Sequence, residues 1–168
     1  MRPVGLRIAT LFAVLPALAA CGLQQSVSDT CPQPGTSTAP AIDAATVTGS
    51  RFSWTSVHGH PVVIDFWGSW CAPCRAEQAD VNRLYAEYAP RGVVFLGVDM
   101  RDDNASAAAF ERDYGVAYPS VNDSASQISA AYDVTAPPTL IVVDAQGTIV
   151  HRCLGTVAGV SADLDHLI

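Results

Sequence analysis

The sequence predicts an α/β fold in which a central mixed β-sheet is flanked by helices and preceded by an added N-terminal β-hairpin. Short apolar runs rich in β-branched residues alternate with segments of helical period between residues 61 and 154. The last two runs are separated only by a turn, which indicates antiparallel neighbours and a mixed sheet. With 168 residues, 49% of them hydrophobic and 15% charged, the chain can bury one ordinary core.

Residues 1–21 are predicted to be a lipoprotein signal peptide. Two arginines precede an apolar stretch, Ile8 to Ala20, that is too short for a comfortable membrane span. The segment LAAC, ending at Cys21, resembles the bacterial lipobox, whose cysteine is acylated and becomes the new N-terminus. The alternative is a cleaved secretory signal that happens to contain a cysteine. A lipid on Cys21 would hold the protein on the outer side of the bacterial cell membrane without crossing it.

Residues 22–45 are predicted to be a flexible tether, and residues 46–168 a folded domain. The tether is rich in Ser, Thr, Gln, Pro and Gly and has no hydrophobic period. The formal net charge of the chain is −7. That charge argues against a nucleic-acid partner, because nucleic-acid binding depends on neutralising phosphates.

The first half of the domain contains two predicted strands and the helix between them. Residues 46–54 predict the small added hairpin. Residues 61–67 (PVVIDFW) and 92–100 (GVVFLGVDM) are of the kind that forms strands covered on both faces. Residues 74–89 have a helical period that ends before Pro90 and Gly92.

The second half of the domain predicts two helices, a hairpin and a final helix. The helices cover about residues 105–114, ended by Gly115, and 124–134. Residues 139–144 and 148–154 flank the turn AQG and predict the hairpin. A short helix follows from Ser161.

Two cysteines lie where the first of these apolar strands ends and its helix begins. Cys71 and Cys74 there face unpaired backbone N–H groups and the positive end of the helix dipole, and both favour the reactive thiolate. Pro73 suits the first turn of a helix, where a missing N–H costs nothing. A Cys-x-x-Cys beside a strand–helix–strand pattern indicates a redox-active disulfide.

Three other interpretations of the cysteine pair fit less well. A zinc site needs four ligands, but the other candidates are distant Cys31, Cys153 and four scattered histidines. A permanent structural disulfide across two residues closes a very small loop and constrains the unfolded chain little. A copper-relay protein would need a wider cysteine spacing and a nearby histidine. We therefore expect no metal and no other cofactor.

The segments FWGSWCAPC and YDVTAPPTLIVVDAQG resemble the thioredoxin superfamily, in particular the TlpA/ResA-like branch of membrane-tethered bacterial thiol–disulfide oxidoreductases. The resemblance covers residues 47–168 and implies a thioredoxin-like fold. It also implies that Pro138 is cis and lies against the cysteines, which leaves the backbone of Pro137 free to pair with an extended substrate segment. The alternative for the two prolines is an ordinary rigid loop. The residues expected to bind substrate are Trp70, Pro73, Pro137 and Thr139.

Asp65 is the polar side chain within the run 61–67. An ionised carboxylate without a partner is costly in a buried strand, so we expect a raised pKa. A carboxyl group poised near neutrality could take the proton from Cys74. Thioredoxin has an aspartate at the matching position, whereas many TlpA/ResA-like proteins carry an acidic residue just after the next strand, where this chain has Asp102. Asp102 is either a second acid of the site or a solvated loop residue.

The resemblance implies that Cys71 forms a mixed disulfide with a partner protein and that Cys74 resolves it. The first hypothesis is a monomeric reductase that passes electrons from a membrane donor to envelope proteins, with apocytochrome c as the typical client. The alternatives are an oxidase that installs disulfides in secreted proteins and a redox-inert peptide-binding module. Ala and Pro between the cysteines favour the reducing direction, because no histidine is there to stabilise the thiolate further.

Cys31 and Cys153 remain. In an oxidising compartment they could form a second disulfide that ties the tether to the C-terminal hairpin. Alternatively, both are free thiols, and Cys153 is buried as a small apolar residue.

Overall fold

The computed structural model describes residues 37–168, which form a five-stranded sheet of order β5-β4-β3-β6-β7 and a two-stranded sheet of β1 and β2. The strands are β1 (Asp43–Ala45), β2 (Arg51–Ser53), β3 (Val62–Trp67), β4 (Val94–Met100), β5 (Ser120–Asp123), β6 (Thr139–Val143) and β7 (Ile149–Leu154). The helices are α1 (Ala72–Tyr88), α2 (Asn104–Tyr114), α3 (Gln127–Ala131) and α4 (Val160–Leu167), with 3-10 turns at Trp54–Val57 and Ala89–Arg91.

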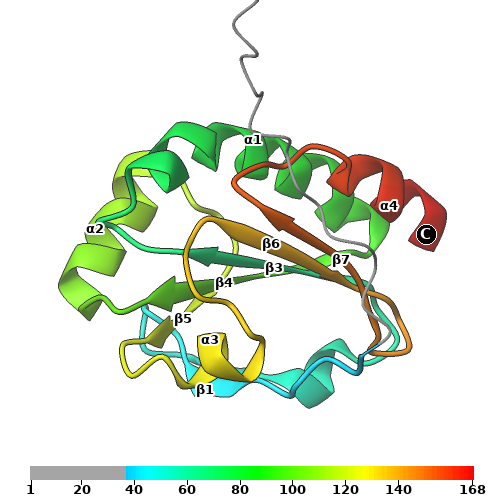
Figure 1. Cartoon of the computed structure of the whole chain (residues 1–168), viewed down its shortest axis with the longest axis horizontal. Helices are drawn as coiled ribbons and strands as arrows, with labels where there is room; N and C mark the ends of the chain where they lie inside the picture. Colours follow the sequence, from blue (N-terminus) through cyan, green and yellow to red (C-terminus); the bar gives the residue numbers. More distant parts are fainter. Residues whose placement is uncertain (1–36) are drawn as a thin grey trace, which may run out of the picture.

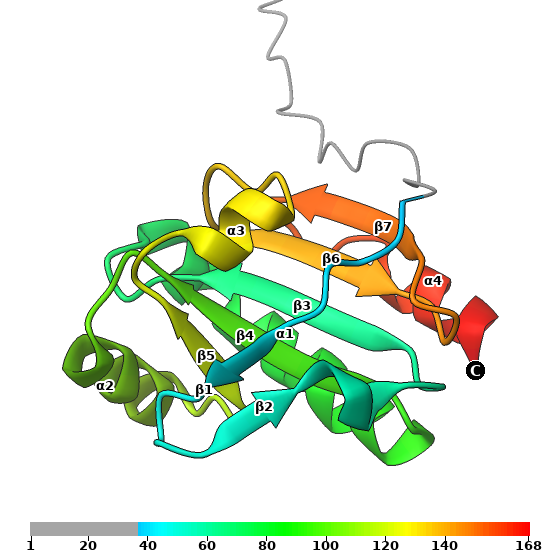
Figure 2. The ribbon, with the colours of Figure 1, turned by 90° about the horizontal axis from the view of Figure 1, so that it is seen from below.

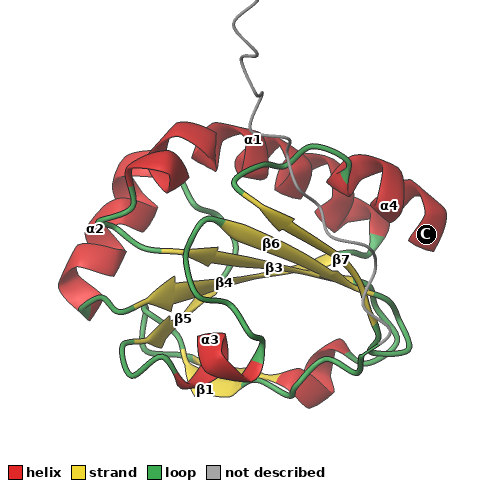
Figure 3. Ribbon diagram, in the orientation of Figure 1, coloured by secondary structure: helices red, strands yellow, loops and turns green. Residues whose placement is uncertain are grey.

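The large sheet is mixed, as predicted. Strand β3 pairs in parallel with β4 and antiparallel with β6, and the β6–β7 pair is the predicted hairpin. Figure 3 shows helices on both sides of the sheet: α1, α2 and α4 lie on one side, and α3 lies with the small β1–β2 sheet on the other. Figures 1 and 2 show the same layers from two directions. The predicted α/β fold with an added N-terminal hairpin is confirmed.

Strand β3 separates the two layers of core, because its side chains point alternately to opposite faces. Val62, Ile64 and Phe66 belong to the apolar cluster on the α3 side. Val63 packs in the cluster under α1 and α4, and Trp67 packs beside α2. Asp65 therefore points into the layer occupied by α1 and α2.

The pairing register of β3 also places the two motifs at one edge of the sheet. Phe66 of β3 lies opposite Thr139, the first residue of β6. The cysteines follow the end of β3, and the prolines precede the start of β6. Two segments more than sixty residues apart in the sequence therefore meet beyond the same end of the sheet.

Several predicted boundaries need correction. Residues 37–45 were expected in the tether, but Ala39 and Ile42 are buried, and β1 pairs with β2. The domain therefore begins before the predicted residue 46, because this polar-looking segment contributes apolar side chains to the core. Helix α1 begins at Ala72, two residues before the expected start, and α3 is shorter than the predicted 124–134.

Strand β5 was not predicted. Its sequence, SVND, is short and half polar, and it forms one edge of the sheet. The predicted signal peptide, Cys21 and most of the predicted tether lie outside the described residues. Among residues 37–168, no helix combines the length and hydropathy needed to cross a membrane.

Candidate active site

The two cysteines form a disulfide at the N-terminus of α1, with Cα atoms 5.3 Å apart. Cys71 is the N-cap residue of α1, and its Sγ accepts a hydrogen bond of 3.1 Å from the backbone N–H of Cys74. Pro73 lies in the first turn, as expected. Both cysteines are buried, with 3% and 2% of their surfaces exposed. A sulfur that accepts a helix N-terminal N–H is one whose thiolate is stabilised after reduction.

Asp102 holds the loop that leads into the disulfide. Its Oδ2 accepts a 2.8 Å hydrogen bond from the backbone N–H of Ser69, two residues before Cys71. Arg75 binds the other side of the same residue, by donating a 2.6 Å hydrogen bond to the Ser69 carbonyl oxygen. Asp102 is thus partly buried and hydrogen-bonded to the loop that leads into the disulfide.

The two tryptophans next to the motif differ in role. Trp70 is 48% exposed, its Nε1 donates to the Met100 carbonyl oxygen at 2.9 Å, and the Arg101 guanidinium lies 4.9 Å from its ring centre. Trp67 is buried and stacks on Phe110 at 4.5 Å. Trp70 therefore presents an aromatic surface beside Cys71, whereas Trp67 serves the core.

The peptide bond between Pro137 and Pro138 is cis, as the resemblance implied. Pro138 is buried, and its carbonyl oxygen accepts from the Gly155 N–H at 3.0 Å. Thr139 is also buried and donates to the Ala136 carbonyl oxygen at 2.8 Å, so its side chain braces this loop and does not face a partner. Pro137 has no N–H, so at this position the backbone can accept a hydrogen bond from a partner but cannot donate one.

Asp65 is buried beneath the first turns of α1. Its Oδ2 accepts a 2.7 Å hydrogen bond from the Tyr118 hydroxyl, and that hydroxyl accepts a 2.8 Å hydrogen bond from Gln78 Nε2. Gln78 follows Cys74 by four residues, so both lie on the same face of the helix. Burial raises the pKa of Asp65 from 3.8 to about 6, and the hydrogen bond from Tyr118 opposes that rise. The direction of this pKa shift is the one expected for a carboxyl group in a buried strand.

Glu77 is an acid of this site that the sequence analysis missed. It follows Cys74 by three residues and so points to the same side of α1. Burial and the nearby charge of Asp65 raise the pKa of Glu77 from 4.5 to about 7. The spacing from Cys74 on a predicted helix was the signal that could have found it.

A further buried acid, Asp99, lies beside Trp67 in the adjacent strand. Its Oδ2 accepts a 2.9 Å hydrogen bond from Asn122 Nδ2, while its Oδ1 has no partner within residues 37–168. Burial, followed by the charge of Asp102, raises the pKa of Asp99 from 3.8 to about 8. Asp65, Glu77 and Asp99 give the layer beneath the disulfide a strongly acidic composition.

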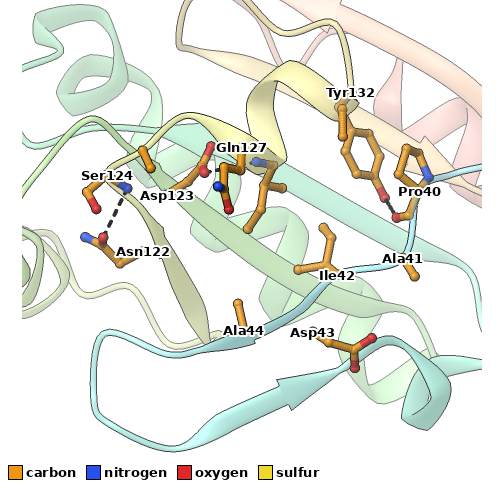
Figure 4. Close-up of a pocket in the computed structure, with 13 residues that line it drawn as sticks. Pro40, Ala41, Ile42, Asp43, Ala44, Asn122, Asp123, Ser124, Gln127 and Tyr132 are labelled. Carbon is orange, nitrogen blue, oxygen red and sulfur yellow. Dashed lines mark hydrogen bonds between the residues drawn. The ribbon is translucent and has the colours of Figure 1, made fainter.

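A cavity of about 460 Å³ lies elsewhere, between the segment Pro40–Ala44 and the region of α3 (Figure 4). Two of its polar side chains are engaged in hydrogen bonds: the Tyr132 hydroxyl donates to the Pro40 carbonyl oxygen at 2.6 Å, and the Asp123 carboxylate accepts from the N–H groups of Ile128 and Ser129. This cavity contains no thiol, and its hydrogen bonds fasten α3 and the N-terminal segment to the sheet.

The fold and the site define a class of protein. A Cys-x-x-Cys disulfide at a helix N-terminus, with a buried acid beneath it and a cis-proline loop at the same sheet edge, is the arrangement of a thioredoxin-like thiol–disulfide oxidoreductase. Residues 36–152 match the model of the AhpC/TSA family, and the chain belongs to that family.

Individual relatives agree with this assignment. The chain is 32% identical to the thiol-disulfide oxidoreductase ResA of Geobacillus kaustophilus over 71% of this chain and 69% of the relative. A secreted Mycobacterium tuberculosis disulfide oxidoreductase homologous to E. coli DsbE is similar in structure, with a TM-score of 0.65, 27% identity and coverage of 75% of this chain and 96% of that chain. A thioredoxin family thiol:disulfide interchange protein of Chlorobium tepidum has a TM-score of 0.68 and 27% identity, over 81% and 94% of the two chains. The protein is a thiol–disulfide oxidoreductase of the ResA/DsbE type with the redox pair Cys71–Cys74.

Proposed function

We propose that the protein is a monomeric, lipid-anchored reductase of the bacterial cell envelope that reduces disulfides in partner proteins, with apocytochrome c as a candidate client. Cys21 would carry the lipid, and a membrane electron donor would return the Cys71–Cys74 pair to its dithiol form. The observation that carries the reducing direction is the buried acid beneath Cys74.

Negative charge beside a cysteine opposes formation of its thiolate. Asp65 lies beneath the helix face that carries Cys74, and Glu77 lies on that face with a pKa raised by burial and by Asp65. An oxidant of the DsbA type depends on a strongly stabilised thiolate in its reduced form. An acidic surrounding works against that stabilisation and so makes the dithiol a better reductant.

The proposed reaction begins with attack of the Cys71 thiolate on a partner disulfide. One partner sulfur leaves as a thiolate and takes a proton, and the other forms a mixed disulfide with Cys71. Asp65, ionised at neutral pH, accepts the proton of Cys74, whose thiolate then attacks the Cys71 sulfur. The partner leaves as a dithiol, and the enzyme is left with the Cys71–Cys74 disulfide seen in the structure.

The surface around Cys71 supports recognition of an extended partner segment. Trp70 offers an exposed ring, and Pro137 offers a backbone carbonyl that can accept a hydrogen bond. The two residues are far apart in the sequence, but both lie beyond the same end of the sheet as the disulfide. Pro73 is exposed on the first turn of α1 and completes the rim. A partner strand that pairs at Pro137 must supply an N–H there.

The deciding experiment is the reduction potential of the Cys71–Cys74 couple, measured by equilibration against glutathione or dithiothreitol with Cys31 and Cys153 replaced by serine. A value near roughly −270 mV, as in thioredoxin, is expected for a reductase. A value near roughly −120 mV, as in DsbA, would show an oxidase and overturn the proposal.

Two further measurements test the partners. In cells, Cys74→Ala should accumulate mixed disulfides on Cys71, and Cys71→Ser should not, because only the first variant keeps the attacking thiol without the resolving one. Labelled fatty acid should be incorporated into the wild-type chain and not into Cys21→Ser. Unlabelled wild-type protein would refute the lipid anchor without bearing on the redox chemistry.

A further inference from the structure

A groove of about 280 Å³ lies between the active-site loop and α2. Its walls include Ser69 and Arg75, which bracket the two redox cysteines in the sequence, and Ala109, Phe110 and Tyr114 of α2. Strand β4, which leads into α2, and strand β6, which follows the cis-proline loop, pair with opposite edges of β3. The groove and the cis-proline loop therefore flank the disulfide from opposite sides.

The floor of the groove is aromatic. Phe110 stacks on Trp67, with 4.5 Å between ring centres, and on Tyr114, with 4.6 Å between ring centres. Trp67 and Phe110 are buried, whereas Tyr114 is 38% exposed, so the stack runs from the core to the surface. Its last ring presents apolar surface that an apolar side chain of a partner would cover.

Arg75 supplies a positive charge to the wall of the groove. It is half-buried, and its Nη1 donates a 2.6 Å hydrogen bond to the Ser69 carbonyl oxygen, which holds the guanidinium against the active-site loop. A guanidinium has several further N–H donors, arranged to bind a carboxylate with two parallel hydrogen bonds. Between residues 37 and 168, no carboxylate lies within ion-pair distance of Arg75. Arg75 is therefore a positioned cation with donors available beside the redox pair.

The carboxylates near the groove have other partners. Asp102 and Asp103 accept hydrogen bonds from backbone N–H groups of the active-site loop and of α2. Asp113, which also lines the groove, is ion-paired with its neighbour Arg112 at 3.1 Å. A carboxylate from outside the domain is therefore the group that would pair with Arg75.

The size and place of the groove suit side chains of a partner protein. Small-molecule sites measure roughly 300–1,000 Å³ and enclose most of their ligand, whereas this groove is smaller and is bordered by exposed Tyr114. Ser69 precedes Cys71 by two residues, a chain length of at most roughly 7 Å. An extended partner segment bonded to Cys71 through its own cysteine reaches that far within about two or three residues.

We propose that this groove recognises an acidic residue next to an apolar one in the partner protein, close to the partner's reacting cysteine. The carboxylate binds the Arg75 guanidinium, and the apolar side chain covers Tyr114 and Phe110. Arg75 thus determines specificity without touching the reacting sulfurs. The proposal rests on thiol–disulfide exchange at Cys71 and holds for either direction of electron transfer, with or without a lipid anchor.

The net charge of the chain makes this preference distinctive. A formal charge of −7 repels an acidic partner at long range and by itself favours neutral or basic ones. A preference for an acidic segment is therefore the opposite of what the overall charge predicts. It would have to come from a local cation.

The test compares two peptides as substrates of the reduced full chain. In each, a central cysteine carries an uncharged 2-pyridyl disulfide, whose release as pyridine-2-thione reports attack by a protein thiol on the peptide sulfur. Leucine and aspartate occupy the second and third positions on both sides of the cysteine in one peptide, and asparagine replaces aspartate in the other. The rate seen with Cys71→Ser is subtracted, so that the remainder belongs to Cys71.

At low ionic strength, the wild-type chain should react about fivefold faster with the aspartate peptide, as expected for one ion pair at the upper end of the surface range. In Arg75→Gln the ratio should fall to one or below. The matched control is Arg83→Gln, at an exposed arginine of the same helix, which should keep the wild-type ratio. Because each ratio is taken within one variant, any change in the reactivity of Cys71 cancels.

A wild-type ratio of one or below would overturn the proposal, because overall charge would then decide. A ratio that stays high in Arg75→Gln would assign the preference to another cation, such as Arg101, and would also overturn it. Should Arg75→Gln fail to fold, Arg75→Lys replaces it, since lysine keeps the charge but not the paired donors. Its ratio should lie below that of wild type, and an equal ratio would refute the paired hydrogen bonds.

The apolar half of the groove is tested with a third peptide, in which serine replaces leucine. Tyr114→Ser should reduce severalfold the advantage of the leucine peptide over the serine peptide, because the ring that leucine covers is gone. An unchanged advantage would refute the contact with Tyr114. The reduction potential, which tests the proposed reducing direction, is independent of all these ratios.

Discussion

The hydroxyl of Tyr118 donates a 2.7 Å hydrogen bond to Asp65 Oδ2 inside the layer between the sheet and α1. The two residues are 53 positions apart, and Gln78 on α1 fixes the hydroxyl from the other side. The contact stabilises the ionised carboxylate, whereas burial destabilises it. The balance leaves a carboxyl group that titrates close to neutral pH beneath the redox cysteines.

Replacing Tyr118 by phenylalanine removes the hydrogen bond that lowers the pKa of Asp65 while leaving the burial that raises it. One hydrogen bond of ordinary strength corresponds to about one pKa unit. The pH midpoint for resolution of a preformed mixed disulfide on Cys71, followed by stopped-flow between pH 5 and 9, should therefore move up by about one unit. Tyr114→Phe, at an exposed tyrosine of α2, is the control and should keep the wild-type midpoint. Identical midpoints in both variants would refute a link between Tyr118 and the proton acceptor.

Asp65→Asn should stabilise the protein at neutral and alkaline pH. The pKa of Asp65 is raised in the folded chain, so its favourable contribution to folding is complete below pH 4 and is lost as pH rises through about 6. The asparagine variant lacks this loss, and its advantage in free energy of unfolding should grow by about 3 kcal/mol between pH 4 and pH 8. Urea unfolding at both pH values measures it, with Asp133→Asn at an exposed position as control. A constant difference across the range would contradict the burial-raised pKa.

Asp99→Asn should also raise the free energy of unfolding relative to wild type, and this difference should grow over a wider pH range. Burial raises the pKa of Asp99 to about 8, so the wild-type chain continues to lose stability as pH rises through that value. Asparagine keeps an oxygen that can accept from Asn122 and removes the buried charge. The difference in free energy of unfolding between the variant and wild type, on the order of a few kcal/mol, should still be increasing between pH 7 and pH 9. Exposed Asp113→Asn is the comparison, and a gain that has already levelled off at pH 7 would argue against this assignment.

Asp102→Ala should free the loop before Cys71. The side chain accepts the Ser69 N–H at 2.8 Å, and a hydrogen bond to a charged acceptor contributes about 1.5–3 kcal/mol. Hydrogen exchange of the Ser69 amide should become at least about tenfold faster. Asp102→Asn retains an acceptor oxygen and should keep most of the protection. If alanine leaves the exchange rate of Ser69 unchanged, Asp102 does not position the active-site loop.

Much of the site was predictable because its signals are local. A strand followed by a Cys-x-x-Cys and a helix places both thiols at a helix N-terminus, whatever lies around them. Asp65 was found because one carboxylate stands alone in an apolar run. Strand β5 was not predicted because its signal is not local. Ser120–Asp123 is short and half polar, and it forms a strand because it pairs with the neighbouring strand β4.

The sequence by itself determined the α/β class and the redox motif, since each depends on residues that are near one another in the chain, and its resemblance to the thioredoxin superfamily implied the cis-proline loop. Only the tertiary structure decided how the acids around the disulfide are buried and bonded, and it added Glu77 and Asp99 to Asp65 and Asp102, which the sequence had indicated. Burial and the charge of Asp65 raise the pKa of Glu77, the Tyr118 hydroxyl donates to Asp65 from a distant part of the sequence, and Asp102 accepts from the Ser69 N–H. Their protonation and contacts depend on burial and on distances between segments dozens of residues apart, and those distances exist only once the sheet and its helices have packed.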